Sequence, residues 1–305
     1  MNDAILRAAA FEQVRRLMVT RAQLTSRDMA MGFYCDGIRI PFVNPQRGIF
    51  KPRQMQYLLS IRTVFPRPGN KVWYDDQRQV HKQIYEGEET IDYAFMGDDP
   101  LAPENQWLKA AMEQRVPILY FLGVAPGLYE PVRPAFIVGW DADTKSAKVA
   151  FGERPIASDL ELPSNTAERR YGLRLVKQRL HQSTFRQAVI DAYQTRCALS
   201  GLPEPLLLDA AHIVDDGDEK LGQPVVQNGL PLSKLHHAAF DAHLIGIDPD
   251  FRIHVSERLR AQQDGPILEA LKGLHGASLH LPKRSQDHPD RYRLAQRFES
   301  FKLTT

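Results

Sequence analysis

Hydrophobic and polar residues follow different patterns along the 305 residues of the chain. In residues 1–24, charged residues interrupt the apolar ones, which predicts an amphipathic helix. From about Gly32 to Gly152, short β-like apolar runs are separated by Gly and Pro, and one helical segment, "NQWLKAAMEQR", lies between Pro100 and Arg115. Many short strands with turns between them predict a small barrel or a strongly curved sheet that carries a helix.

A polar, proline-punctuated stretch, Glu153 to Glu168, predicts a linker, and a basic run follows it from Arg169 to Arg186. The run holds six Arg or Lys residues and no acidic residue: Arg169, Arg170, Arg174, Lys177, Arg179 and Arg186. Such a run is either a solvated helix face or an arm that contacts phosphates. The pattern alone leaves both interpretations open.

The last third of the chain combines helical and strand patterns. In "STFRQAVIDAYQTRC" a Ser/Thr cap precedes apolar residues at helical spacing, which predicts that a helix begins there. "LLLDAAHI" is typical of a buried strand, and it ends at His212. A polar loop leads to Asn228, and a helix then carries His237 and Asp241, one turn apart.

Composition adds a few exclusions. The chain is 43% hydrophobic and 25% charged, as in a soluble globular protein, and it is long enough for two domains. Its two cysteines, Cys35 and Cys197, exclude a disulfide framework and a Cys-based zinc site. The N-terminus is too charged for a signal peptide, and the longest apolar run contains Pro and Gly and is too short to span a bilayer. We therefore expect a cytoplasmic protein with no membrane association.

His237 and Asp241 are the first candidates for chemistry. A neutral imidazole and a carboxylate that project from one helix face are ligands for a single divalent cation. Taken singly, these residues could equally be surface side chains, and Asn228-Gly229 could be an ordinary turn. The ordered set of His212, Asn228, His237 and Asp241 is much less common than any one of them.

This ordered set resembles the HNH nuclease family, whose ββα-metal finger is a two-stranded ribbon packed on a helix. The resemblance covers roughly residues 185–247 and is carried by "CALSGL", "AAHI", "NGLPL" and "HHAAFD". It implies that His212 is the general base and that Asn228 holds the ribbon and orients the His212 ring. It further implies that His237 and Asp241 bind one Mg²⁺ ion, or Mn²⁺ or another transition metal in vitro.

Two positions depart from the family pattern. Many members carry a carboxylate or His directly before the catalytic His, where this chain has Ala211. Asp209 is the nearest acid and a possible third ligand, although it faces the opposite side of a regular strand from His212. Some members also bind zinc through a CxxC pair, but Cys197 has no such partner, so we expect no structural zinc and a core position for Cys197.

Residues 32–152 resemble the SRA-like sensor modules of modification-dependent restriction enzymes, which belong to the PUA-like barrel group. The resemblance rests on the texture and order of segments such as "GIRIPFVNPQRGIFKPRQM", "VWYDDQ" and "IDYAFMGDDP". It implies that a modified cytosine, commonly 5-methylcytosine or 5-hydroxymethylcytosine, is flipped out of double-stranded DNA into a pocket. The candidate pocket residues are Trp73, Tyr74, Asp75, Asp76 and Tyr93.

Each of those pocket residues has a plainer alternative, because aromatic residues mostly fill cores and adjacent Asp residues mostly form turns. Arg47, Lys51 and Arg53 surround Phe50 in "RGIFKPR". This segment could contact DNA phosphates, insert into the duplex as a wedge, or form an exposed loop.

The predicted fold class is α+β, with an SRA/PUA-like curved β-barrel domain followed by an HNH ββα-metal finger with surrounding helices. The predicted segments are an N-terminal helix (1–24), a sensor domain (25–152), a linker with the basic arm (153–183) and a nuclease domain (184–305).

The predicted function is that of a Type IV-like, modification-dependent restriction endonuclease. We expect a homodimer, because a double-strand break needs two nicks. The alternatives are an HNH nuclease gated by a nucleotide signal or by unmodified DNA, and a non-catalytic protein that binds modified DNA.

Overall fold

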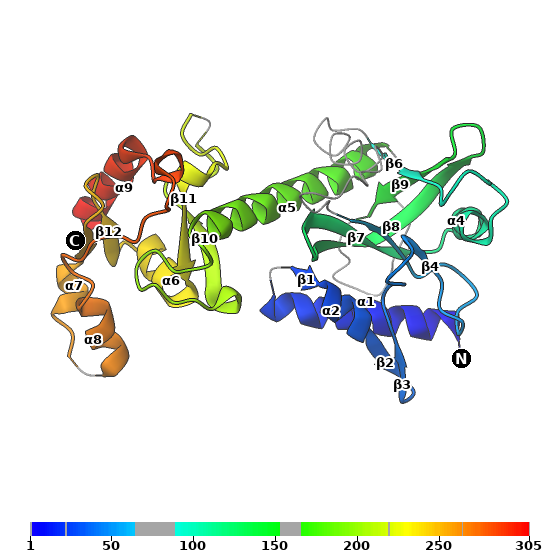
Figure 1. Ribbon diagram of the computed structural model, residues 1–305, viewed down its shortest axis with the longest axis horizontal. Helices are drawn as coiled ribbons and strands as arrows, with labels where there is room; N and C mark the ends of the chain where they lie inside the picture. Colours follow the sequence, from blue (N-terminus) through cyan, green and yellow to red (C-terminus); the bar gives the residue numbers. More distant parts are fainter. Residues whose placement is uncertain are drawn as a thin grey trace. The chain divides into compact units, whose positions relative to one another are not determined.

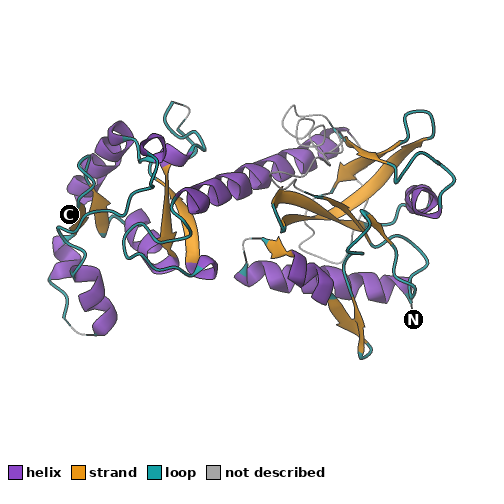
Figure 2. Cartoon of the chain, viewed as in Figure 1, coloured by secondary structure: helices purple, strands orange, loops and turns teal. Residues whose placement is uncertain are grey.

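The computed structural model describes residues 2–21, 23–64, 89–152, 166–218, 220–263 and 265–304 (Figure 1). The chain forms two compact units, Met1–Ser183 and Thr184–Thr305. Helices and strands occur in both units, which gives a mixed α+β fold (Figure 2).

The first unit is built on a seven-stranded curved sheet with the strand order β4-β5-β7-β8-β9-β6, and β1 pairs with β8 beside this path (Figure 1). Strands β5 and β7 are parallel, and the other pairs are antiparallel. The strands of this sheet are β1 (Leu24–Thr25), β4 (Ile49–Phe50), β5 (Ser60–Thr63), β6 (Ile91–Ala94), β7 (Ile118–Ala125), β8 (Leu128–Asp141) and β9 (Ser146–Phe151). The remaining elements are α1 (Asp3–Thr20), α2 (Ser26–Met31), the hairpin of β2 (Phe33–Cys35) and β3 (Ile38–Ile40), α4 (Pro103–Glu113) and the start of α5 (Thr166–Ala192).

Strand β7 lies at the centre of this unit, and all of its residues are buried. Its side chains alternate between two cores, as the pleat of a strand requires. Leu119 and Phe121 pack in the core that includes residues of α1. Ile118, Tyr120 and Leu122 pack in the opposite core, which includes residues of α4 and α5. The sheet is therefore covered on both faces, which explains the nearly continuous apolar run in the sequence.

Helix α1 is part of the first unit. Leu6, Ala10 and Val14 are fully buried against the sheet. The buried Arg7 donates hydrogen bonds to the carbonyl oxygens of Leu58 and Pro117, and its guanidinium pairs with Asp3. The segment that the sequence sets apart as residues 1–24 thus packs into the same body as the strands.

Helix α5 runs without interruption from Thr166 to Ala192, so the helix start expected at "STFRQ" is wrong. The hydroxyl of Ser183 donates to the carboxylate of Glu130 instead of capping a new helix. Leu173, Val176 and Leu180 pack into the core of the first unit, which makes the first part of the basic run one face of a packed helix.

The second unit holds a ββα arrangement. Its elements are the end of α5, η1 (Pro205–Leu207), β10 (Leu208–His212), η2 (Val226–Asn228), β11 (Gly229–Ser233), α6 (Lys234–Asp241), β12 (Ile245–Ile247), β13 (Ile253–Val255), α7 (Glu257–Arg260), α8 (Pro266–Lys272), η3 (Ser285–Asp287) and α9 (Arg291–Thr304). Antiparallel β10 and β11 form a ribbon, and α6 packs against both strands. One core of residues from these elements, including Leu208, Leu230 and Phe240, joins them. Across the described parts of the chain, no helix combines the length and apolarity that a bilayer span requires.

Candidate active site

His212 lies at the end of β10, directly opposite Gly229 in the β10–β11 register. Gly229 leaves room for α5, because a Cβ atom there would meet Val189 Cγ2 at 2.3 Å and the Phe185 ring at 2.8 Å. The Phe185 ring stacks on the His212 ring with 4.1 Å between centroids and 16° between planes. Phe185 of α5, which packs in the space left by Gly229 of β11, thus sets the orientation of the imidazole.

One ring nitrogen of His212, Nε2, is buried without a hydrogen-bond partner among the described residues. Burial lowers the pKa of His212 below 6.5, while the charges of Asp216 and Asp215 in the following loop oppose this shift. The ring is therefore neutral at neutral pH and can accept a proton, which is what a general base requires.

Asn228 is fully buried and clasps the loop that follows His212. Its Oδ1 accepts from the backbone N–H of Val214 at 2.9 Å, and its Nδ2 donates to the carbonyl oxygens of Val214 and Gln223. Its own carbonyl oxygen accepts from Ile213 N. Asn228 therefore holds the backbone of the loop that follows His212, because the hydrogen bonds of its side chain go to backbone atoms of that loop.

Helix α6 brings His237 and Asp241 together, as their spacing predicts. Ser233 caps the helix by accepting from His236 N, which fixes its first turn. The Nε2 atom of His237 lies 3.2 Å from an Asp241 carboxylate oxygen. Contact with Asp209 and, against the effect of burial, the charge of Asp241 raise the pKa of His237.

Asp209 belongs to the same group of side chains, which its position on β10 did not indicate. One carboxylate oxygen lies 4.0 Å from His237 Nδ1, and the other lies 3.8 Å from Arg186 Nε. Contact with His237 lowers the pKa of Asp209 against the opposing effect of burial. Arg186 also donates to the carbonyl oxygen of Leu208 at 2.7 Å, so its guanidinium is bonded to β10.

Arg297 of α9 is a site residue that the sequence did not reveal. Its guanidinium lies over the Phe240 ring, donates to the Phe240 carbonyl oxygen and approaches Asp241 Oδ1 at 3.6 Å. Asp241 is thus held from one side by Arg297 and faces His237 with its other oxygen. The sequence offers no signal for this contact, because Arg297 is one of several cations on an amphipathic helix far along the chain.

Cys197 is a core residue with a polar partner. It is fully buried, its Sγ lies 3.3 Å from His236 Nδ1, and it accepts from Ser233 N. Burial opposes ionisation of the thiol, but hydrogen bonds with His236, Ser200 and Ser233 outweigh it and lower the pKa of Cys197 to about 6. This contact ties the chain before β10 to the first turn of α6.

The match to known proteins covers the same elements. Residues 197–248 match the family model of the HNH endonucleases. This segment is an HNH endonuclease domain. It begins at Cys197, includes the β10–β11 ribbon and α6, and ends after β12. The chain therefore carries a nuclease, and HNH nucleases work with a divalent metal ion.

The other comparisons add little. A solved structure described as "Modification dependent TagI restriction endonuclease" is similar to the chain at 14% identity and a TM-score of 0.31, over 84% of this chain and 86% of that one. No curated protein matches the chain.

The donors of the HNH domain fit one divalent ion with two protein ligands. His237 and Asp241 supply an adjacent nitrogen and oxygen, the donor types that Mg²⁺, Mn²⁺ and related ions accept. In the described ranges, no group of three or more His, Cys, Asp or Glu side chains is arranged to hold a metal. Water would complete such a shell, as is usual for Mg²⁺.

The base-pocket prediction falls mostly outside the described residues, where Trp73, Tyr74, Asp75 and Asp76 lie. Tyr93 is described, and its ring is a core residue with 6% exposure. Its hydroxyl donates to the carbonyl oxygen of Arg62. In this position Tyr93 offers no open face on which a base could stack.

The predicted backbone-contacting cations have different environments. On α5, Arg174 is exposed and Arg170 is exposed beside Glu89, at 3.2 Å, while Arg169, Lys177 and Arg179 are half-buried. Around β4, Arg47 pairs with Glu104, the Lys51 ammonium lies over the Trp107 ring, and Arg53 is exposed.

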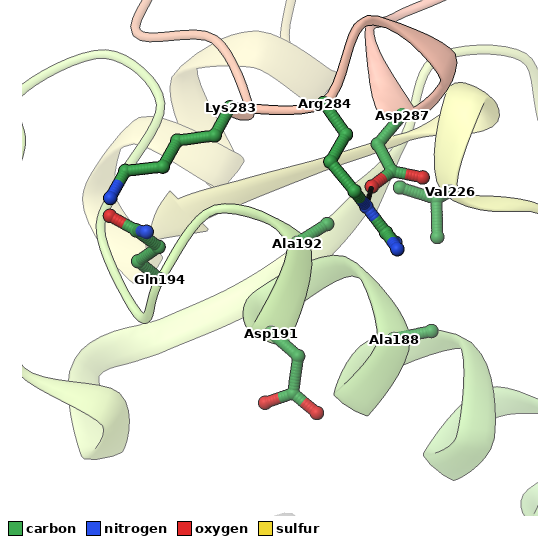
Figure 3. Close-up of a pocket in the computed structure, with 8 residues that line it drawn as sticks. All are labelled: Ala188, Asp191, Ala192, Gln194, Val226, Lys283, Arg284 and Asp287. Carbon is green, nitrogen blue, oxygen red and sulfur yellow. Dashed lines mark hydrogen bonds and ion pairs between the residues drawn. The ribbon is translucent and has the colours of Figure 1, made fainter.

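A cavity of about 490 Å³ also lies in the second unit, between the end of α5 and the segment around η3 (Figure 3). Ala188, Ala192 and Val226 line it, and Arg284 at its edge is paired with Asp287 at 2.7 Å. None of the predicted site residues lines this cavity, so it is separate from the HNH site.

Proposed function

We propose that this protein is a modification-dependent restriction endonuclease that hydrolyses DNA phosphodiester bonds at the His212 site. The observation that carries the nuclease half is the position of His212. It ends β10 in the ribbon against which α6 packs, and α6 carries His237 and Asp241 with 3.2 Å between His237 Nε2 and an Asp241 carboxylate oxygen. We infer that the proton acceptor and the pair of metal ligands act on the same phosphate.

In the proposed reaction, His212 accepts a proton from the attacking water, and the P–O3′ bond breaks to leave a 5′-phosphate and a 3′-hydroxyl. Phe185 and the Asn228 clasp keep the imidazole in place. His237 and Asp241 bind the divalent ion, and Mg²⁺ is the proposed ion. In the present geometry Asp209, the further ligand that the sequence suggests, faces the other ring nitrogen of His237. When bound, the ion neutralises charge on the scissile phosphate and on the leaving oxygen.

The recognition half rests on the resemblance of residues 32–152 to SRA-like modules, and the curved sheet of the first unit is compatible with it. We infer that this unit selects DNA with 5-methylcytosine or 5-hydroxymethylcytosine. Exposed cations such as Arg53 and Arg174 would contact the DNA backbone. A homodimer would place two nuclease sites on one duplex.

Cleavage of matched plasmids tests both halves. The full chain is incubated with Mg²⁺ or Mn²⁺ and with methylated, hydroxymethylated or unmodified plasmid. We expect cleavage of a modified plasmid only, and no cleavage after addition of a chelator. Equal cleavage of all plasmids would reject modification sensing, and binding of modified DNA without cleavage would reject the nuclease half.

His212→Ala is the matching active-site variant. We expect it to bind modified DNA like the wild type and to lose cleavage. His280→Ala is the control, because His280 is an exposed histidine of the same unit that lies outside the site. Cleavage by His212→Ala at the wild-type rate would show that another group is the base.

A further inference from the structure

The first unit contains a pocket of about 310 Å³ beside the loop before β5. Its lining includes the Trp107 ring of α4 and the side chains of Asn44, Arg47, Lys51 and Arg53. We propose that this pocket binds a nucleoside phosphate, with the base against Trp107 and the phosphate on Lys51 and Arg53. This pocket would be a further binding site of the proposed endonuclease, and it lies in the unit that is proposed to recognise DNA.

The Trp107 ring is held in place by packing against the core. Trp107 is half-buried on α4 and packs against the core of the first unit, while part of its ring lines the pocket. A flat base gains most from stacking on a ring that is already fixed, because little conformational freedom is then lost on binding. Apolar Pro41 and Phe50 line the same pocket and extend this surface.

Two cations lie beside the ring on which the base would stack. The Lys51 ammonium lies 5.3 Å from the centre of the Trp107 ring. It also donates to the Met55 carbonyl oxygen at 3.2 Å. A flexible lysine stem lets the ammonium leave the ring face when a base takes its place and lets it follow the phosphate. Arg53 is exposed at the edge and can donate two hydrogen bonds to phosphate oxygens.

The charge balance favours an anion. The pocket is lined by Arg47, Lys51 and Arg53, and the carboxylate of the buried Glu104 pairs with Arg47. That pair holds the segment before β4 on α4, and among the described residues no carboxylate pairs with Lys51 or Arg53. An anionic ligand is therefore attracted, whereas a neutral nucleoside would leave these two charges without a counter-charge.

The segment before β4, which carries Arg47 and lines one side of the pocket, is held by hydrogen bonds from Arg62. Arg62 Nη2 donates to the Pro45 carbonyl oxygen, and Arg62 N donates to the Gly48 carbonyl oxygen at 2.7 Å. Gly48 passes so close to Tyr93 that a Cβ atom would meet the Tyr93 hydroxyl at 2.6 Å. Tyr93 thus packs against the segment before β4, and this buried aromatic residue contributes indirectly to the shape of the pocket.

The size of the pocket matches one nucleotide. Ligand pockets start at about 300 Å³, so this one is small for a pocket and suits a single base with its sugar and phosphate. The nucleotide can be free in solution, or it can be one unit of a DNA strand that has left the stack. The shared chemistry is an aromatic base joined to a phosphate, and the experiment separates the two sources.

The test uses the full chain and two binding measurements without metal. Calorimetric titration measures affinity for free deoxynucleoside monophosphates, with inorganic phosphate as a second probe. Fluorescence anisotropy measures affinity for a labelled duplex that contains modified cytosine. The variants are Trp107→Phe, Trp107→Leu, Arg53→Gln and the double variant Lys51→Gln/Arg53→Gln. Arg39→Gln is the charge control for Arg53→Gln, because Arg39 is exposed in the same unit and does not line the pocket.

We expect Trp107→Leu to weaken binding about fivefold to a hundredfold, the usual range for loss of one base–aromatic stack, and Trp107→Phe to keep most of it. The double variant should weaken binding at least about tenfold, with a lower salt dependence. If monophosphates bind the wild type and the variants lose them, the ligand is a free nucleotide. If only the duplex binds and the variants lose it, the ligand is a nucleotide of the strand.

The proposal is overturned if the Trp107 and double variants bind both probes like the wild type, or if Arg39→Gln weakens binding as much as Arg53→Gln. It is also overturned if inorganic phosphate binds as tightly as the monophosphates and the variants leave duplex binding unchanged. Thermal unfolding checks that each variant is folded. A failed nuclease proposal looks different, because the wild type then cuts no plasmid while the binding measurements still respond to Trp107.

Discussion

The ring of Phe185 lies nearly parallel to the ring of His212, with centroids 4.1 Å apart. Phe185 is buried on α5 and His212 ends β10, so the packing of the helix on the ribbon determines where the imidazole points. Because the stacked ring also excludes water from the imidazole, this contact contributes to the burial that lowers the pKa of His212.

Phe185→Leu keeps a buried apolar side chain of similar size and removes the flat ring. We expect kcat to fall about tenfold to a hundredfold, because a base displaced by a fraction of an ångström no longer meets its proton well. The affinity for DNA should stay unchanged. Single-turnover cleavage and anisotropy measure the two quantities. A variant that cuts at the wild-type rate would show that stacking has no part in positioning His212.

The pH dependence of kcat follows from the lowered pKa of His212. The base must be neutral, and a pKa below 6.5 means that more than half of it is neutral at pH 6.5 in the folded enzyme. At saturating metal, kcat should therefore keep more than half of its plateau at pH 6.5 and fall below that. In Phe185→Leu the midpoint should move up towards 6.5. A wild-type midpoint above 6.5 would contradict this assignment.

Saturating metal matters in that experiment because of His237. Its raised pKa means that a proton competes with the metal as the pH falls. The metal concentration needed for half-maximal activity should therefore increase towards low pH, while kcat at saturation reports on His212. Measuring both at each pH separates the two imidazoles.

Gly229→Ala should disturb the same contact from the other strand. The new Cβ would lie 2.3 Å from Val189 Cγ2, so α5 must shift or the side chains must leave their rotamers. We expect a loss of about 1–3 kcal/mol of unfolding free energy and a lower kcat. Gly273→Ala is the control, since a Cβ there meets only backbone oxygens at 3.3 Å or more. Urea unfolding and cleavage rates measure the effect, and equal behaviour of the two variants would refute it.

Asn228→Ala removes a buried clasp and leaves the N–H and carbonyl of Val214 without their partner. Each buried group left unpaired costs about 1–3 kcal/mol, so we expect a loss of roughly 3 kcal/mol in stability together with a loss of cleavage. Asn105→Ala removes a fully buried asparagine of the first unit and should lower stability while leaving the intrinsic cleavage rate unchanged. Calorimetry and single-turnover cleavage report the two effects. Full cleavage by Asn228→Ala would assign the residue a purely structural role.

Asp241→Asn and Asp209→Asn test the ligand set. If Asp241 binds the ion, Asp241→Asn should increase the metal concentration for half-maximal activity by about tenfold to a hundredfold. The same increase in Asp209→Asn would make Asp209 a ligand, and a small change would leave it as a partner of His237 and Arg186. An unchanged metal requirement in Asp241→Asn would show that the ion is held elsewhere.

The sequence predicts the local elements well because each leaves its own periodic pattern. The amphipathic start became α1, and "NQWLKAAMEQR" became α4. The run that ends at His212 became β10 only from Leu208, because Leu206 and Leu207 belong to η1 and are exposed. The ordered His212, Asn228, His237 and Asp241 led to the HNH domain for the same reason, since spacing along one strand and one helix is local information.

What the sequence missed depends on contacts between distant segments. Arg297 reaches Asp241 from another helix. Asp209 was named as a possible ligand, but its contact with His237 depends on the way α6 packs on the ribbon. The continuous α5 was missed because Ser183 has a partner, Glu130, more than fifty residues earlier, so its hydroxyl is not a cap. Tyr93 is of a residue type suited to a base pocket, but tertiary packing buries its ring in the core.

The Asn228 clasp has a consequence for the loop between the two strands of the ribbon. Both ends of the loop are fixed near Val214 and Gln223, whereas residues 215–218 and Lys220 are exposed. The position of the imidazole is thereby separated from the length of the loop, while the charges of Asp215 and Asp216 still act on its pKa. An insertion after these two residues, such as a fluorescent label or a grafted DNA-contacting segment, should therefore leave the imidazole in place and give access to redesigning where the enzyme cuts.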